Sequence, residues 1–596
     1  MILRTCLALC LTAAPLCAQQ ATDAVPPEMT TDLSAPIEDP ALRASQEAKA
    51  EGLSVAATSW MISAAHPEAV RVGADVLRAG GTAADAMVAV QAVLGLVEPQ
   101  SSGLGGGGFL LYYDATSGAL TTLDGRETAP MAATPTLFQN ASGEPMGFFE
   151  AVVGGLSVGV PGTPALMAAA HAKWGTAAWD TLLAPAITMA EDGFPVSARL
   201  SAMIAFDQDR LAVHPDTAAY FLPGGTPLAA GDILKNPAYA ETLRTLAEQG
   251  IDPFYSGPIA EEIVTAVMNA PQPGRLTGWD MRNYLVKERP PTCAEFLDYD
   301  VCGMGPPSSG GITVAQILGL SATADATRDQ TSAEPALDTA TLFGNASRLA
   351  FADRGRYIAD SDFVPLPVKG LLDPAYLKDR ATLATPDAAL KEVTPGQPGW
   401  DHAMNLADHV GRALPSTTHM SIVDSYGNAL SLTSSVENAF GSRLMAGGFL
   451  LNNQLTDFSF RSHTDGTPIA NSVEPGKRPR SSMAPTIVMQ AGKPRLVIGS
   501  PGGSRIIGYV AETIWRHLKD GDDIQAAIAA PHMVNRFGTY DIETAPEAEA
   551  LKARLESRGF KVNITDLNSG LHGVAITDKG LLGAADPRRE GIAYGE

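Results

Sequence analysis

The pattern of apolar and polar residues differs between the first part of this chain and the part that follows residue 416. Apolar segments with helix start and stop residues predict helices at 67–78, 82–97, 163–173, 179–192, 238–249 and 259–269. The second of these helices carries Thr82 and Asp85 in the arrangement of a capping box. Residues 419–433 instead predict short strands. A helix-rich first part and a strand-rich second part are consistent with an α+β fold.

The strands after residue 416 predict a hairpin with a defined register. Segments 419–423 and 429–433 alternate between polar and apolar residues, and Gly427 between them suits the left-handed position of a three-residue loop. This loop pairs Asp424 with Asn428. The prediction is sharp, because a slip of one residue would turn every side chain to the other face.

Counted outward along the hairpin, Thr417 falls opposite Ser435. The Ser435 hydroxyl would then reach the Thr417 hydroxyl, or its α-amine if the chain is cut before Thr417. Glu437 lies two residues further and points to the same face.

Candidate chemistry lies at the start of this hairpin. A threonine hydroxyl is a poor nucleophile without a base, and one solution makes the threonine an N-terminus whose own α-amine takes the proton. Residues 499–505 read Gly-Ser-Pro-Gly-Gly-Ser-Arg and provide backbone amides that could stabilise an oxyanion. We therefore predict a precursor that cuts itself between Ser416 and Thr417. A Thr-Thr-His strand alone is usually structural, so the prediction depends on the surrounding residues.

Composition and charge exclude some partners. The chain has 596 residues, of which 45% are hydrophobic and 18% charged, as in ordinary globular proteins. Its formal net charge of −23 argues against binding to nucleic acid or to anionic membrane surfaces, because both would repel it.

The N-terminus has the layout of a signal peptide. Arg4 precedes a short apolar run at 6–14, and small residues follow at Cys17 and Ala18. We expect a signal peptide at 1–18, no membrane span, and export to a bacterial periplasm. A lipid anchor on Cys17 and a buried N-terminal helix are the less favoured alternatives. Residues 19–50 are rich in Pro, Thr and acids, and we expect a mobile acidic tail there.

Two cysteines would remain after export. Cys293 and Cys302 flank residues 297–300, a plausible turn between two strands. In an oxidising compartment we expect a disulfide between them, and the alternative is two unpaired buried thiols. We expect no metal site, because the histidines lack metal-ligand spacing.

Motifs spread over residues 53–591 resemble the γ-glutamyltranspeptidase family of the N-terminal nucleophile hydrolases. They include Leu-Asp-Gly-Arg-Glu-Thr-Ala-Pro at 123–130 and Thr-Thr-His at 417–419. The other matching segments are 98–109, 160–162, 306–311, 352–354, 451–458, 477–483 and 500–505.

The resemblance implies a four-layer αββα sandwich built from two subunits of one precursor. The large subunit would be 51–416 and the small catalytic subunit 417–596. No metal or organic cofactor is implied. The expected substrates are small molecules: glutathione and other γ-glutamyl amides as donors, and amino acids, dipeptides or water as acceptors.

The same resemblance implies the roles of the reacting groups. Thr417 would attack the γ-glutamyl carbonyl and form an ester. The amides of Gly502 and Gly503 would hold the oxyanion, and Ser435 would support the nucleophile with its hydroxyl.

The substrate's glutamyl head carries a carboxylate and an ammonium, and the resemblance implies a complement for each. Arg126 would pair with the α-carboxylate. The additional hydroxyl donors would be Ser481 and Ser482. The groups around the α-ammonium would be Asp457, Glu437 and Gln454. Residues 459–480 correspond to the family's variable lid.

Two other functions remain open. A cephalosporin acylase of the same fold would remove glutaryl groups, which lack the α-ammonium and gain little from Asp457 and Glu437. An unprocessed homologue would only bind γ-glutamyl peptides, and it would show no self-cleavage.

Overall fold

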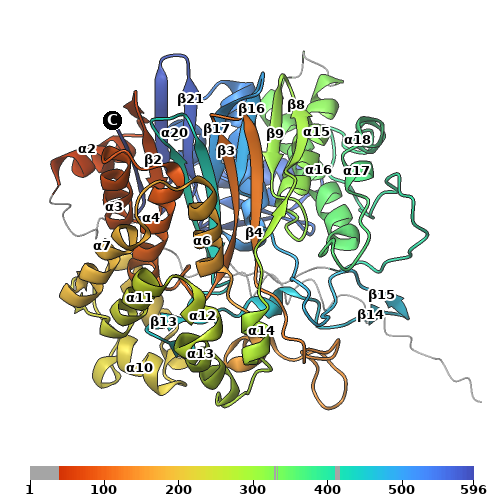
Figure 1. Cartoon of the computed structure of the whole chain (residues 1–596). Helices are drawn as coiled ribbons and strands as arrows, with labels where there is room; N and C mark the ends of the chain where they lie inside the picture. The colour runs from red at the N-terminus through yellow and green to blue at the C-terminus, as the bar shows by residue number, and fades with distance from the viewer. Residues whose placement is uncertain (1–38, 328–330, 332, 410–415) are drawn as a thin grey trace, which may run out of the picture.

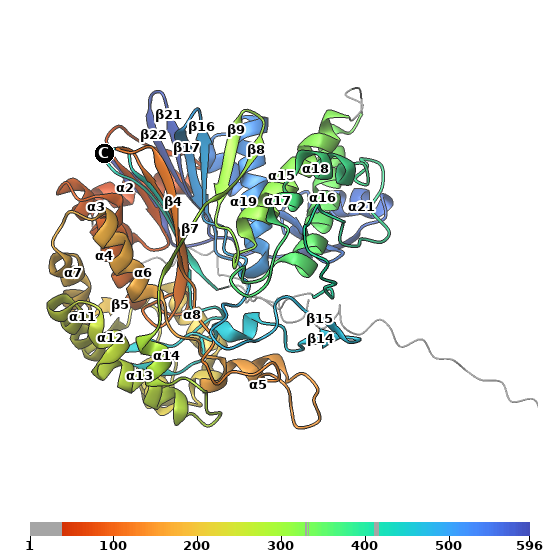
Figure 2. The same cartoon turned by 45° about the vertical axis from the view of Figure 1, so that its right-hand side comes forward.

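The computed structural model describes residues 39–327, 331, 333–409 and 416–596. Two seven-stranded sheets stack face to face in its centre, with helices covering both outer faces (Figure 1 and Figure 2). All neighbouring strands in both sheets are antiparallel. The four-layer αββα arrangement expected from the resemblance is thus confirmed.

The first sheet contains strands from both ends of the chain. Its order is β1 (Val55–Ala57), β22 (Gly580–Ala585), β21 (His572–Thr577), β17 (Lys493–Gly499), β16 (Thr486–Gln490), β9 (Tyr299–Gly303) and β8 (Thr292–Phe296). Its outer face is covered by α15 (Gly310–Ala326), α16 (Pro335–Tyr357), α19 (Ile506–Trp515) and α20 (Ile524–Ala529).

The second sheet carries the candidate nucleophile strand near its centre. Its order is β23 (Ile592–Gly595), β2 (Met61–Ala64), β10 (Thr418–Val423), β11 (Ala429–Ser435), β3 (Gly107–Asp114), β4 (Ala119–Gly125) and β7 (Lys287–Arg289). The helices on its side are α3 (Pro67–Arg78), α4 (Ala83–Val97), α6 (Thr163–Trp174), α7 (Trp179–Asp192), α11 (Pro237–Gln249) and α13 (Pro258–Met268). These are the six helices predicted from the sequence, and Thr82 and Asp85 form the predicted capping box.

Smaller elements surround this frame. Below the second sheet lie α5 (Phe148–Val152), α8 (Ala198–Phe206), α10 (Pro215–Phe221), α12 (Asp252–Ser256) and α14 (Gly278–Arg282) (Figure 1 and Figure 2). The short helix α9 (Gln208–Leu211) contacts α8 and α10. Beside the first sheet lie α17 (Val368–Leu371), α18 (Pro374–Ala381), α21 (Ala548–Ser557) and a small sheet of β18 (Met533–Asn535), β19 (Thr539–Glu543) and β20 (Lys561–Thr565).

Two apolar cores hold the layers together. One lies between the second sheet and its helices and includes the almost wholly buried α4. The other fills the space between the sheets and beneath α15 and α19; Phe109 and Leu111 reach it from β3, and Ile487 and Val497 from the facing sheet. Both sheets are therefore fixed on both faces, which gives the site a rigid support.

The hairpin of β8 and β9 contains a disulfide. Cys293 and Cys302 are directly opposite in the register, and their Cα atoms are 4.0 Å apart. The turn inferred from residues 297–300 places the two thiols side by side.

The N-terminal region corrects one prediction. Residues 40–50 form helix α2 (Pro40–Ala50) instead of a mobile tail: Asp39 caps its first turn and Leu42 is buried in the core. Local composition did not predict this helix, because the residues it packs against lie far away in sequence, such as Arg589 and Gly591, whose carbonyls bind Lys49. The predicted signal peptide at 1–18 and residues 19–38 lie outside the described residues. In the described part of the chain, no helix is long and apolar enough to cross a membrane.

Candidate active site

The hairpin of β10 and β11 has the predicted register. Thr418 pairs with Ser434, the loop closes between Asp424 and Asn428 with an N···O distance of 3.1 Å, and Gly427 has a φ of 86°. The hydroxyl oxygens of Thr417 and Ser435 are consequently 3.1 Å apart. This proximity confirms the register, and it places a second hydroxyl beside the candidate nucleophile.

His419 serves the strand rather than the reaction. Its ring is fully buried, with Nδ1 2.8 Å from the Thr433 hydroxyl and Nε2 3.1 Å from the Ser421 hydroxyl. Burial holds the pKa of His419 well below its usual value, so the imidazole is neutral. With both ring nitrogens bonded to strand neighbours, His419 stabilises the hairpin that carries Thr417.

One pocket gathers the predicted site residues. Its lining contains every one of them except Gly502: Arg126, Thr417, Ser435, Glu437, Gln454, Asp457, Ser481, Ser482 and Gly503. The remaining lining residues are Ser416, Met483 and Ile506. Segments from residue 126 to residue 506 therefore converge on a single site beside the end of β10.

Ser416 and Thr417, the two residues of the predicted cleavage site, both line this pocket. The Thr417 hydroxyl contacts the Ser416 carbonyl oxygen, and the Ser435 hydroxyl lies 3.4 Å from the same oxygen. The Ser416 hydroxyl donates to the Gln100 carbonyl at 2.6 Å, which fixes the residue on the other side of the bond.

The Ser435 hydroxyl is oriented by the backbone after it. Glu437 N donates to Ser435 Oγ at 2.8 Å, so the Ser435 proton is available for Thr417 or for the Ser416 carbonyl. Glu437 itself has a φ of 81°, uncommon for a residue with a side chain, and Asn453 donates to its carboxylate at 2.5 Å. This conformation holds the Glu437 carboxylate at the pocket wall.

The glycine loop opposite the nucleophile requires glycine for steric reasons. Gly502 has a φ of 131° and Gly503 a φ of 59°. A Cβ atom on Gly502 would lie 2.7 Å from the Tyr509 ring. The loop leads into α19, whose N-terminal end favours negative charge.

The far end of the pocket contains a buried ion pair. Arg126 Nη2 donates to Asp457 Oδ2 at 2.5 Å, and Gln454 Nε2 donates to the same oxygen at 2.9 Å. Arg126 is only 1% exposed, and its guanidinium also donates to the carbonyls of Pro479 and Arg480. The resemblance implies that these two charges bind different parts of a substrate, and in this structure they bind each other.

Two arginines at this end were missed from the sequence. Arg354 on α16 donates to the Ser482 hydroxyl at 2.7 Å and to the Ser309 hydroxyl at 2.8 Å. Burial lowers the pKa of Arg480 to about 10, so its guanidinium remains charged at neutral pH. Segment 352–354, which matches the family, was the sequence feature that could have indicated Arg354.

A buried acid lies next to this ion pair. Glu127 is wholly inaccessible to solvent, with its carboxylate 3.9 Å from Arg126 Nη1. Burial raises the pKa of Glu127 to about 8, against the opposing effect of Arg126, so the carboxyl group is protonated at pH 7.

We expect the substitution Glu127→Gln to stabilise the protein progressively as pH rises from 4.5 towards 8. Between the unfolded pKa of 4.5 and the folded pKa of about 8, the native wild type binds a proton that the unfolded chain does not. Its stability therefore falls by up to about 1.4 kcal/mol per pH unit in this window, whereas the amide has no such dependence. The difference in Tm between the two proteins, measured at pH 5 and pH 8 in the uncut Thr417→Ala background, should grow with pH. An equal difference at both values would contradict the protonated state.

No metal-binding cluster accompanies these residues. Across residues 39–327, 331, 333–409 and 416–596, no group of three or more His, Cys, Asp or Glu side chains is arranged to hold a metal ion. The polar side chains that line the pocket carry carboxylates, hydroxyls, one amide and one guanidinium group.

Comparison with known proteins identifies the family. The model of the γ-glutamyltranspeptidase family matches residues 69–596. The chain belongs to this family. A glutathione hydrolase proenzyme of Bacillus subtilis (strain 168) is 36% identical over 550 residues, which cover 90% of this chain and 91% of the relative. An acylase ACY 1 proenzyme of Pseudomonas sp. (strain SE83) is 32% identical over 541 residues, covering 89% and 92%.

A solved structure supports the same assignment. The crystal structure of a cephalosporin acylase from Bacillus halodurans matches with a TM-score of 0.80 at 25% sequence identity, covering 91% of this chain and 97% of that one. The proteins similar to this chain therefore include one named for glutathione, one named as an acylase and one named for cephalosporins.

Proposed function

We propose that this chain is a γ-glutamyl hydrolase and transferase that uses Thr417 as its nucleophile after cutting itself. The observation that carries the proposal is the shared pocket: the Thr417–Ser435 hydroxyl pair lines the same small cavity as the buried charges of Arg126 and Asp457. A hydroxyl nucleophile and complements for a carboxylate and an ammonium are what a γ-glutamyl amide requires.

Self-cleavage forms the nucleophile. Thr417 Oγ1 attacks the Ser416 carbonyl carbon, the C–N bond breaks, and the hydroxyl proton passes to the departing Thr417 nitrogen, so that the acyl group moves from nitrogen to oxygen. Water then hydrolyses the ester, leaving a carboxylate on Ser416 and a free α-amine and hydroxyl on Thr417. Ser435 supports this step because its hydroxyl lies 3.1 Å from the attacking oxygen. The products are a large subunit ending at 416 and a small subunit, 417–596, held together as a heterodimer.

Turnover repeats the acyl transfer on a donor. The Thr417 α-amine takes the hydroxyl proton as Oγ1 attacks the γ-carbonyl carbon, and the amides of Gly502 and Gly503 hold the oxyanion. Collapse of this intermediate expels the amine of the donor, which takes a proton from the α-ammonium. A γ-glutamyl ester remains on Thr417, and water or an amino acid amine then attacks it.

The donor's head group determines the selectivity. Its α-carboxylate binds Arg126 and the Ser481 and Ser482 hydroxyls, and Arg354 orients Ser482 by donating to it at 2.7 Å. Its α-ammonium binds Asp457 and Glu437 with help from Gln454. The ion pair between Arg126 and Asp457 is replaced by these contacts, so that neither buried charge loses its partner.

A glutaryl acylase is the second candidate, supported by relatives named as acylases and by the fold match. A glutaryl group has no ammonium, so it would compete with Asp457 for Arg126 and leave that carboxylate buried without a cation. The two acids in the pocket therefore favour the γ-glutamyl substrate. A binding protein without self-cleavage is the third candidate, and the positions of Thr417, Ser435 and Gly503 in one pocket argue against it.

Paired chromogenic donors distinguish these functions. We expect purified enzyme to release aniline from a γ-glutamyl anilide at least 10-fold faster, in kcat/KM, than from the matching glutaryl anilide, because only the first offers an ammonium to the acids. A preference for the glutaryl donor would favour the acylase, and no turnover of either by an uncut chain would favour the binding protein.

We also propose that the protein acts in the periplasm. The support is the signal-peptide layout of residues 1–18 together with the paired Cys293 and Cys302, which suit an oxidising compartment.

A further inference from the structure

A residue near the C-terminus, Arg589, contacts the backbone of the candidate nucleophile Thr417. Arg589 is 5% exposed and follows β22 in a turn before β23. Its Nη1 lies 3.4 Å from the backbone carbonyl oxygen of Thr417, to which it donates. The residue is outside the pocket lining, so its contact with the nucleophile is through the main chain.

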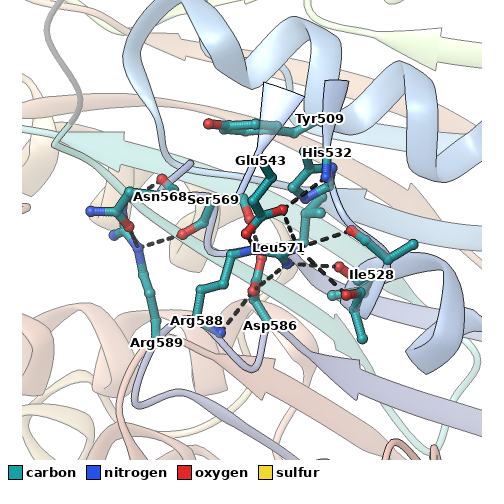
Figure 3. Close-up of polar contacts among 12 residues, drawn as sticks. Tyr509, Ile528, His532, Glu543, Asn568, Ser569, Leu571, Asp586, Arg588 and Arg589 are labelled. Atoms are coloured by element: carbon teal, nitrogen blue, oxygen red, sulfur yellow. Dashed lines mark hydrogen bonds and ion pairs between the residues drawn. The ribbon is translucent and has the colours of Figure 1, made fainter. Parts of the chain in front are cut away.

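The same guanidinium holds a second segment, 568–570. Arg589 Nε donates to the Ser569 carbonyl at 2.7 Å and to the Asn568 side chain at 3.1 Å, and Nη2 donates to the Asn568 carbonyl at 3.4 Å (Figure 3). Arg589 therefore joins this loop to the nucleophile residue.

Segment 568–570 in turn packs against the glycine loop. A Cβ atom on Gly570 would lie 2.5 Å from Pro501 and 2.7 Å from Arg589 Cδ, and one on Gly502 would lie 3.7 Å from the Asn568 carbonyl oxygen. Gly570 therefore has no room for a side chain between Pro501 and Arg589. One side chain thus contacts the residue that attacks and supports the loop that would stabilise the oxyanion.

The turn that carries Arg589 is itself fixed by charge. Asp586 accepts from the Ser569 hydroxyl at 2.5 Å and from Leu571 N at 3.1 Å, and Arg588 donates to both carboxylate oxygens of Glu543 (Figure 3). Although burial alone would raise it, the pKa of Asp586 is held well below its usual value, chiefly by Arg588. The carboxylate is ionised, and the turn is rigid.

Helix α2 holds the other side of the turn. Lys49 Nζ donates to the carbonyls of Arg589 at 2.8 Å and Gly591 at 2.7 Å. Burial lowers the pKa of Lys49 to about 8, so the ammonium is still charged at neutral pH. The helix that the sequence did not predict is therefore a strap across the C-terminal segment.

We propose that Arg589 is a positioning residue for the nucleophile, and that Lys49 of α2 holds the segment that carries it. The inference rests on the proposed role of Thr417. Once the bond to Ser416 is cut, Thr417 is a chain end held covalently on one side only. A buried cation bonded to its carbonyl then restricts the rotation of the residue and directs the hydroxyl and amine towards the glycine loop.

The test compares Arg589→Gln and Arg589→Lys with wild type as the processed two-subunit enzyme. We expect Arg589→Gln to lower kcat for a γ-glutamyl anilide 10- to 100-fold with KM changed less than threefold, and to slow self-cleavage, because loss of alignment penalises the reacting step. Arg589→Lys should restore part of kcat. The matched control Arg495→Gln removes a half-buried arginine of β17 and should leave kcat unchanged.

Lys49 tests the strap independently. Lys49→Met should lower kcat 3- to 10-fold while Lys49→Arg keeps it, and the double variant with Arg589→Gln should be no slower than Arg589→Gln alone, since both act through one segment. If the two single variants lose kcat to the same extent and the losses multiply in the double variant, Lys49 does not act through the segment that carries Arg589.

Other results separate this inference from the proposed function. A kcat for Arg589→Gln within twofold of wild type, or a loss confined to Tm and shared by Arg589→Lys, would overturn the positioning role alone. A wild-type chain that neither cuts itself nor turns over γ-glutamyl donors would refute the proposed function and this role with it.

Discussion

Thr417→Ala is expected to leave the protein as one uncut chain and to abolish turnover of γ-glutamyl donors. The substitution removes the hydroxyl that contacts the Ser416 carbonyl and lies beside Ser435. Loss of a covalent nucleophile lowers kcat by on the order of 10⁴-fold or more in related chemistry, because the oxygen that forms the ester is gone. Denaturing gel electrophoresis and a γ-glutamyl anilide assay measure the two effects on one preparation.

Thr417→Ser is the matched control, since it keeps a hydroxyl at the same position. It should cut itself and retain measurable activity, because the register opposite Ser435 is unchanged. Processing of Thr417→Ala at the wild-type rate would show that another group cuts the chain.

Asp457→Asn is expected to reverse the selectivity between γ-glutamyl and glutaryl donors. The substitution leaves Arg126 without its 2.5 Å carboxylate partner and deprives the substrate's ammonium of a buried anion. Truncating one member of a buried charge pair costs about 2–5 kcal/mol, so KM for the γ-glutamyl anilide should rise on the order of 100-fold. The glutaryl donor has no ammonium to lose, and its carboxylate gains the unpaired Arg126.

The glutaryl anilide is therefore the internal control for this variant. Its kcat/KM should stay level or rise while that of the γ-glutamyl anilide falls. Equal losses for both donors would mean that Asp457 is needed for the shape of the pocket and not for recognition of the ammonium.

Features set by neighbours in sequence could be predicted here. The capping box of Thr82 and Asp85 and the loop glycine at 427 each act within a few residues, so the helix α4 and the hairpin register follow from local chemistry. The proximity of Thr417 and Ser435 then follows by counting along two strands.

Features that depend on residues far away in sequence could not be predicted. Helix α2 is held by Leu42 in the core and by Lys49 on carbonyls near the C-terminus, and nothing within residues 40–50 indicates either contact. The resemblance brought Arg126 and Asp457 to the site, but it did not indicate that the two side chains bond to each other. Arg354 and Arg480 lie in segments that match the family, but neither was given a role, because a buried arginine cannot be told from a surface one in sequence.

The most direct test of the account is the mass of the small subunit after brief mixing with a γ-glutamyl donor and quenching in acid. The account predicts a fragment that begins at Thr417 and is heavier by one γ-glutamyl group, with peptide mapping placing the ester on Thr417. An uncut chain, or a γ-glutamyl group on any other residue, would contradict it.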